Sequence, residues 1–170
     1  MFGAPRSLLR YGLTVSGPRD FLINLAINTV VPAWLLLGRD SVGWYGDPSV
    51  LSLWGPMGFL LVFFTTFFGY LNGISQRQAG RHGDPLPPGW WWLPIALPSA
   101  VLRGVLMMIV FMGVVIVLVA VFGPRQFPSG LLILAQGLFA GLFAYAVQVH
   151  GVLLADRLVA PPQLSQTTHE

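Results

Sequence analysis

Two asparagines and a proline recur at intervals of four residues in an apolar run near the start of the chain. Asn24 and Asn28 share one face of a predicted helix, because residues four apart lie one turn above each other. Pro32 has no N–H to donate to the carbonyl of Asn28, so that carbonyl stays open to other partners. This face therefore offers two amides and a carbonyl that can bond to neighbouring helices or contact a solute.

Other polar residues fall at similar depths in the later apolar runs, when depth is counted at 1.5 Å per residue from the helix ends on the same side. On this count Asn24 lies roughly 6 Å deep, while Asn28 and Thr65 both lie roughly 12 Å deep. We therefore expect one polar cluster in that half of a helical bundle. Its predicted members are Asn24, Asn28, Thr65, Thr66, Asn72, Arg103, Gln148 and His150.

Two of the arginines are candidates for binding a lipid phosphate. Arg103 lies in the first turn of a predicted helix, where unpaired backbone N–H groups add to its positive field. The alternative, which we favour, is that its long side chain extends to the membrane surface without binding a specific anion. Arg19 directly precedes the first apolar run, at the level of anionic headgroups.

His150 follows Ala146 by four residues, and this Ala-x-x-x-His pairing resembles the pigment-ligating pattern of bacterial light-harvesting polypeptides. The resemblance implies a tetrapyrrole, either a pigment or a haem, held by the His150 imidazole. It thereby adds one alternative function, that of a pigment- or haem-associated membrane subunit. No other pattern in the sequence requires a cofactor.

The residue types that most enzymes need are scarce. The chain has no cysteine, which excludes disulfides, thiolate nucleophiles and cysteine-based metal sites. His82, His150 and His169 are too far apart for the spacing of a metal site. The predicted spans contain no Asp, Glu or Lys, so proton-coupled export through a membrane-embedded carboxylate is not expected. We expect neither catalysis nor a bound metal.

The composition shows where these residues must be positioned. The 170 residues are 55% hydrophobic and only 9% charged, whereas soluble domains carry about 25% charged residues. The nine basic residues are scattered arginines, a pattern that does not favour nucleic-acid binding. We predict an all-α integral membrane protein, a bundle of four transmembrane helices at 21–38, 49–73, 99–123 and 129–155, each long enough to cross about 30 Å of hydrocarbon.

The segments outside the spans divide the chain further. We expect residues 1–20 to form an arginine-rich segment at the cytoplasmic membrane surface, 21–160 the membrane domain and 161–170 a disordered cytoplasmic tail. Pro56 leaves two alternatives for the second span: a kinked helix from Pro48, or a short turn followed by a helix that begins at Gly55. We favour the second.

The arginines predict the orientation. Seven of them fall on one side of the predicted bundle and two on the other, and positive charge favours the cytoplasmic side. Both termini are then cytoplasmic, and we expect the cytoplasmic (inner) membrane of a bacterium. Tryptophans are expected to anchor the chain at the two membrane interfaces. The predicted anchors are Trp44, Trp54, Trp90, Trp91 and Trp92.

The fourth predicted span carries small residues at helical spacing, Gly137 with Gly141 and Ala140 with Ala144, which allow another helix to pack closely. From this surface we predict an accessory or scaffolding subunit of a larger membrane complex. Its expected contacts are membrane lipids and other transmembrane subunits or copies of itself. The main alternative is a small homo-oligomeric channel or transporter with a cytoplasmic polar vestibule.

Overall fold

A computed structural model of the chain describes residues 7–82, 84–122 and 126–158. Arg6, Arg125 and the predicted disordered tail lie outside the described residues. The regular structure of the described chain is helical apart from one short two-stranded pairing, and non-helical connections join α2 to α3 and α3 to α4. Its elements are helices α1 (Leu8–Tyr11), a π-helical turn (Gly12–Ser16), α2 (Gly17–Leu35), α3 (Val50–Gln78), α4 (Leu93–Phe122) and α5 (Ser129–Asp156), with strands β1 (Ser41–Val42) and β2 (Phe127–Pro128).

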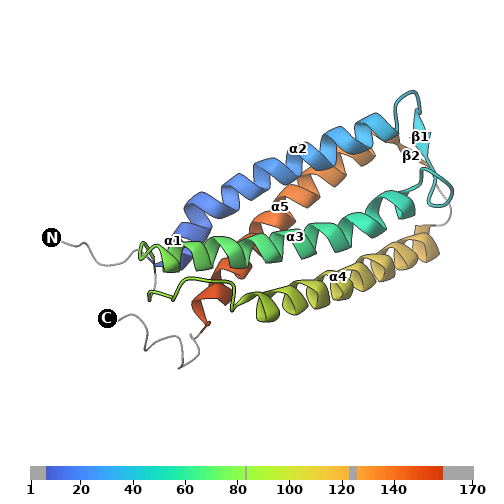
Figure 1. The fold of residues 1–170 in the computed structure, drawn as a ribbon. Helices are drawn as coiled ribbons and strands as arrows, with labels where there is room; N and C mark the ends of the chain where they lie inside the picture. The colour runs from blue at the N-terminus through green and yellow to red at the C-terminus, as the bar shows by residue number, and fades with distance from the viewer. Residues whose placement is uncertain (1–6, 83, 123–125, 159–170) are drawn as a thin grey trace, which may run out of the picture.

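The four long helices lie roughly alongside one another in an open arrangement (Figure 1). Helix α5 packs between α2 and α3, and α4 packs on the other side of α3. Helices α2 and α3 hardly touch each other. The described start of the chain, the connection between α3 and α4, and the end of α5 all lie at one end, which we call the α1 end; β1 and β2 lie at the opposite end, the β end.

Three of the described helices are long and apolar enough to cross a membrane: α3, α4 and α5. They correspond to the second, third and fourth predicted spans. Helix α2 corresponds to the first, but it begins at Gly17 and so includes Arg19 and Asp20 in its first turn. The short helical segments before it continue directly into α2.

Prolines interrupt two of the helices less than the sequence suggested. Helix α3 runs without a break through Pro56 from Val50, where Ser49 and Ser52 form a reciprocal capping box. Our preferred start at Gly55 is therefore wrong, because the caps already stabilise an earlier first turn. Helix α4 begins at Leu93, six residues before the predicted start of the span, and runs through Pro98. The missing N–H of Pro98 removes only one helical hydrogen bond.

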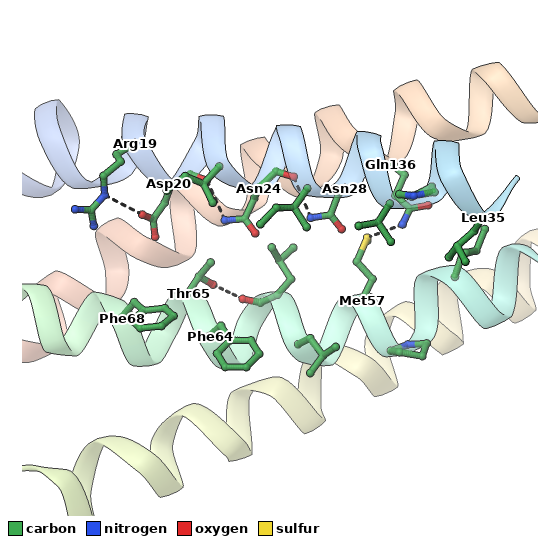
Figure 2. Close-up of a pocket in the computed structure, with 18 of the residues that line it drawn as sticks. Arg19, Asp20, Asn24, Asn28, Leu35, Met57, Phe64, Thr65, Phe68 and Gln136 are labelled. Atoms are coloured by element: carbon green, nitrogen blue, oxygen red, sulfur yellow. Dashed lines mark hydrogen bonds and ion pairs between the residues drawn. The ribbon is translucent and has the colours of Figure 1, made fainter. Parts of the chain in front are cut away.

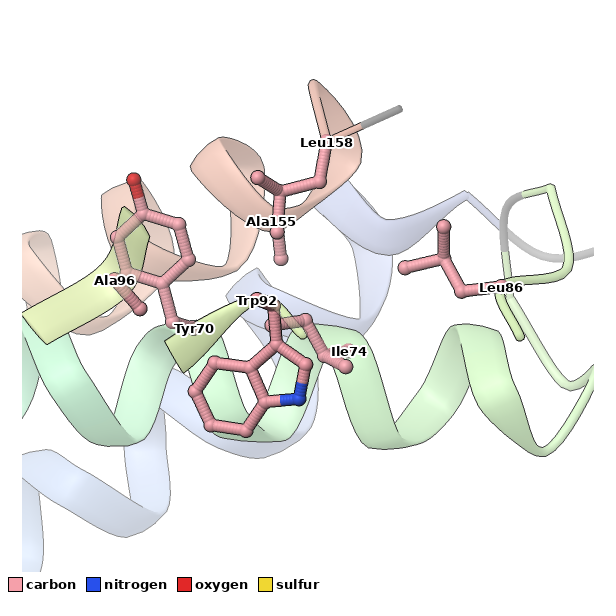
Figure 3. Close-up of a cluster of buried hydrophobic side chains, with 7 residues drawn as sticks. All are labelled: Tyr70, Ile74, Leu86, Trp92, Ala96, Ala155 and Leu158. Atoms are coloured by element: carbon pink, nitrogen blue, oxygen red, sulfur yellow. The ribbon is translucent and has the colours of Figure 1, made fainter. Parts of the chain in front are cut away.

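The α1 end of the bundle is closed by a cluster of buried side chains that includes Trp92, Tyr70 and Ile74 (Figure 3). Trp92 is 2% exposed and donates from its indole nitrogen to the carbonyl of Gly89. It is thus a core residue and not the membrane-surface anchor we expected. Trp90 is 68% exposed, and Trp91 is half-buried.

Arg77 joins three segments at the same end. The residue is 5% exposed, although Arg77 is one of the seven arginines predicted to fall on the cytoplasmic side. One guanidinium nitrogen donates to the carbonyls of Ala155 and Leu158 at 2.6 and 2.9 Å, and Nε donates to the carbonyl of Asp84 at 2.8 Å. A cation in this position complements the negative C-terminal end of α5 and adds donors to the carbonyls that follow its last turn.

The β end is closed by the β1–β2 pairing. Ser41 pairs with Pro128 and Val42 with Phe127, while the N–H of Ser129 donates to the carbonyl of Asp40 at 3.0 Å. Trp44 is 5% exposed and meets Phe127 edge to face. It is buried in a core cluster at this end, unlike the surface anchor we expected, and Trp54 is half-buried.

Helix α5 uses its small residues on two faces. A Cβ added at Gly137 would meet Thr29 of α2, and one at Gly141 would lie 3.1 Å from Phe21 of α2. Ala140 and Ala144 are fully buried and belong to a cluster with Met57 and Leu61 of α3. Close packing on both sides places α5 at the centre of the arrangement and leaves α2 and α3 separated across it.

Candidate binding groove between α2 and α3

Because α2 and α3 are both held by α5, a groove of about 860 Å³ runs between them (Figure 2). Helix α2 forms one wall, α3 forms the other, and Gln136 of α5 contributes to the floor. We call this the α2–α3 groove. Its volume lies in the range of sites that bind small molecules.

The walls are built from rows of residues four apart, which lie above one another on a helix. Each helix contributes two rows. Those of α2 are Arg19-Ile23-Ile27-Val31-Leu35 and Asp20-Asn24-Asn28-Pro32; those of α3 are Ser52-Pro56-Leu60-Phe64-Phe68-Asn72 and Leu53-Met57-Leu61-Thr65. The α2–α3 groove is therefore straight and follows the helix axes.

At 1.5 Å per residue, the lining residues extend over roughly 24 Å of α2 and roughly 30 Å of α3. This is close to the hydrocarbon thickness of a bilayer, about 30 Å. Arg19, Asp20 and Asn72 mark the α1 end, and Leu35 and Ser52 mark the β end. Most of the lining between them is apolar.

One α2 row supplies polar groups to this apolar lining. The side-chain nitrogen of Asn24 donates to the carbonyl of Asp20 at 2.9 Å, and that of Asn28 donates to the carbonyl of Asn24 at 3.0 Å. Both bonds stay within α2. Among the described residues, neither amide bonds to another helix. Hydrogen bonds from these asparagines therefore do not fix how α2 packs.

Asp20 begins the same row. It is 7% exposed, and its carboxylate accepts from Nε of Arg19 at 3.5 Å. The Arg19 side chain is 51% exposed, so the pair extends from the groove wall to the surface at the α1 end. A buried carboxylate beside a cation keeps this end of the groove close to neutral.

Gln136 is a buried polar residue of the groove that comes from the third helix, α5. It is 3% exposed, and its Nε2 donates to the sulfur of Met57 at 3.1 Å. Its Oε1 is buried without a hydrogen-bond partner. In Figure 2 the Gln136 side chain extends from α5 into the space between α2 and α3.

The structure distributes the predicted polar cluster over several places. Asn24, Asn28, Thr65 and Asn72 line the α2–α3 groove. The remaining four are not among its lining residues: Thr66 and Gln148, which are buried, Arg103, which is half-buried, and His150, which is exposed. The eight residues thus do not face a single space, because four line the groove and the other four lie outside it.

Gln148 and Thr66 occupy helix interfaces. Gln148 donates from Nε2 to the hydroxyl of Ser16 at 2.6 Å, which ties α5 to the π-helical turn. Thr66 lies where α3 crosses α5, since a Cβ added at Gly151 would come within 3.0 Å of its carbonyl oxygen. Both side chains retain one buried oxygen without a partner.

Asp20 and Gln136, two polar residues of the groove, were not predicted from the sequence. Asp20 was left out because the first span was expected to begin at residue 21, whereas α2 begins at Gly17. Gln136 was not predicted as a site residue, although it directly precedes Gly137, which was predicted to pack against another helix. Asp20 lies four residues before Asn24, just as Asn24 lies four residues before Asn28. This spacing could have identified Asp20 as a member of the same row.

The comparisons with known proteins give no further guide to this groove. No family model, curated protein or solved structure matches the chain.

Proposed function

We propose that the chain is a non-catalytic membrane protein that serves as an accessory or scaffolding subunit of a larger membrane assembly. The supporting observation is the position of α4. It is the most apolar of the long helices, yet only 12% of its most apolar stretch is buried, against 44% for α3 and 33% for α5. A helix that packs so little inside its own chain offers its surface to lipid or to another transmembrane helix.

Gly113 favours another helix as the neighbour of α4. It is exposed, and a Cβ added there would find, among the described residues, no atom of another helix within 4 Å. By contrast, Gly104 on the same helix packs against Phe59 of α3. Small residues in transmembrane helices let a second helix approach closely. We assign that role to Gly113, with the exposed side chains of Val110, Val114 and Val117 around it.

The proposal includes a membrane placement with four spans. Helix α2 is 19 residues long, roughly 28 Å, and presents Leu22, Val30 and Trp34 to its surroundings. These large exposed apolar side chains support a lipid environment for α2. The arginine distribution then supports cytoplasmic termini in the inner membrane of a bacterium.

A small homo-oligomeric channel or transporter is the second candidate. The observation that favours it is the row of Asn24 and Asn28 in the α2–α3 groove, with Thr65 on the facing wall. Polar groups along a groove that runs the length of two helices can line a path for a solute once a second copy closes the open side.

Native mass spectrometry after gentle solubilisation distinguishes the two. An accessory subunit predicts a stoichiometric foreign transmembrane partner with the wild-type chain. Gly113→Leu should remove that partner without lowering the melting temperature, because none of the described residues from other helices packs against Gly113. Gly113→Ala is the matched control and should retain the partner. A defined homo-oligomer that moves solute in liposomes would contradict the accessory role and support the channel.

A further inference from the structure

In the α2–α3 groove, three polar side chains each donate a hydrogen bond to a backbone carbonyl of their own helix. Asn24 and Asn28 donate to backbone carbonyls of α2, and the Thr65 hydroxyl donates to the carbonyl of Leu61 on α3. A carbonyl oxygen can only accept, so each of these side chains must turn a donor toward its own helix. Its own oxygen is then left to face the groove or its walls.

Gln136 repeats this arrangement at greater depth. Its nitrogen is used on Met57, and its oxygen is buried without a partner. A buried acceptor that finds no donor carries a desolvation cost of about 1–3 kcal/mol. Since each amide keeps only one further N–H, acceptor sites outnumber donors along the groove. Away from Arg19, Ser52 and Asn72 at its ends, the groove therefore offers more acceptor sites than donors.

These acceptors lie well inside the helices. Gln136, Met57 and Asn28 are each seven residues from the β end of their helix, and so roughly 10 Å inside the bundle. Under the proposed membrane placement this level is hydrocarbon, where an ordinary acyl chain has no group to donate. The occupant that fits must therefore carry donors on a long apolar body.

We propose that the α2–α3 groove binds a long-chain lipid whose hydroxyl groups donate to Gln136 Oε1 and to the side-chain oxygens of Asn28 and Asn24. The donors are neutral hydroxyls and not an amine, because Asp20 already accepts from Arg19 and the groove end carries no net charge. The apolar body of the lipid lies against the two rim rows, which include Ile27 and Phe64.

A lipid fits this groove better than a transmembrane helix of another protein. The backbone N–H groups of a spanning helix are consumed by its own carbonyls, so few donors would reach the acceptor row. The volume of about 860 Å³ also falls within the usual range of small-molecule sites. The rim residues Ile23, Leu60 and Phe68 are 46–47% exposed, so the side of the groove is open to a molecule that enters from the bilayer.

The test compares two lipids that share one acyl chain and differ in their hydroxyls. Monoolein carries two free hydroxyl groups, and methyl oleate carries none. Binding of each to the purified full-length chain in detergent is measured by native mass spectrometry. The wild-type chain should prefer monoolein by about tenfold, since each hydrogen bond contributes roughly three- to tenfold.

Two groups of variants locate the binding. Gln136→Leu and, separately, Asn28→Leu should each reduce the preference for monoolein about three- to tenfold. Asn28→Leu keeps the test valid if Gln136→Leu fails to fold, because Asn28 bonds only within its own helix. Leu60→Trp should fill the groove and weaken both lipids. Leu102→Trp, on the exposed side of α4, is the matched control and should change neither.

Equal binding of the two lipids to the wild-type chain would overturn the proposal, as would a preference that survives both Gln136→Leu and Asn28→Leu. Insensitivity to Leu60→Trp would also overturn it, because the lipid would then bind elsewhere. The inference uses the membrane placement but not the accessory role. Loss of the lipid preference leaves the Gly113 partner assay unaffected, so the two proposals fail separately.

Discussion

Gly69 of α3 and Gly151 of α5 face each other where the two helices cross. A Cβ added at Gly69 would lie 2.8 Å from the Cα of Gly151, and one added at Gly151 would lie 2.9 Å from the Cα of Gly69. Only hydrogen atoms fit at this crossing, so the two backbones are in direct contact. This contact, together with Ala140 and Ala144, fixes α3 on one side of α5.

We expect Gly69→Ala to destabilise the folded protein by about 1–3 kcal/mol, because the added methyl group would meet backbone atoms that cannot move aside. The thermal melting temperature in detergent measures the effect. Gly113→Ala is the matched control, since the same methyl group would find open space, and it should melt at or above the wild-type temperature. Equal melting of Gly69→Ala and the wild type would refute the close crossing.

Arg77→Leu should destabilise the protein by about 3 kcal/mol or more. The substitution leaves the carbonyls of Asp84, Ala155 and Leu158 without the guanidinium donor in a buried region. Arg81→Leu removes an equal charge from an exposed position and should change stability by less than about 0.5 kcal/mol. If both variants melt alike, Arg77 does not hold the end of α5.

Ser16→Ala should destabilise the protein by about 1–2 kcal/mol, because it leaves the buried amide of Gln148 without any partner. Adding Gln148→Leu should then restore most of the lost stability, since the apolar side chain needs no partner. The double variant therefore melts above Ser16→Ala alone. A double variant that melts lower than Ser16→Ala would indicate that Gln148 makes another stabilising contact.

The double variant Asn24→Leu/Asn28→Leu should keep its melting temperature close to that of the wild type. Both amides bond to their own helix, so no interhelical hydrogen bond is lost. A loss of more than about 1 kcal/mol would instead support the packing role that the sequence also allowed. The melting temperature thus distinguishes a packing role of these asparagines from contact with a solute.

The helices were the part of this fold that the sequence predicted best. The last predicted span, 129–155, agrees within one residue with α5, because Pro128 and Ser129 mark its start. The start of α4 was missed, because Pro98 was taken as a boundary although α4 continues through it. Trp92 was expected at the membrane surface, and only tertiary packing against Tyr70 and Ile74 makes it a core residue.

The α2–α3 groove was predicted only in part. Four polar residues of its walls were expected to converge, since depth along a helix follows from counting residues. The open space between α2 and α3 could not be predicted, because it depends on how α5 holds both helices through Gly137, Gly141 and Gly151. Gln136 enters the groove from that third helix, and the periodicity of α2 and α3 carries no information about it.

In the proposed placement α2 crosses the membrane together with α3, α4 and α5, which puts the α2–α3 groove inside the bilayer. Because the chain has no cysteine, single-cysteine variants report the side of each position without background. Ser7→Cys and Arg81→Cys should react with a membrane-impermeant maleimide from the same, cytoplasmic side, and Ser41→Cys from the opposite side. Labelling of Ser7→Cys and Ser41→Cys from one side, with Arg81→Cys on the other, would show that α2 does not cross and would contradict the account.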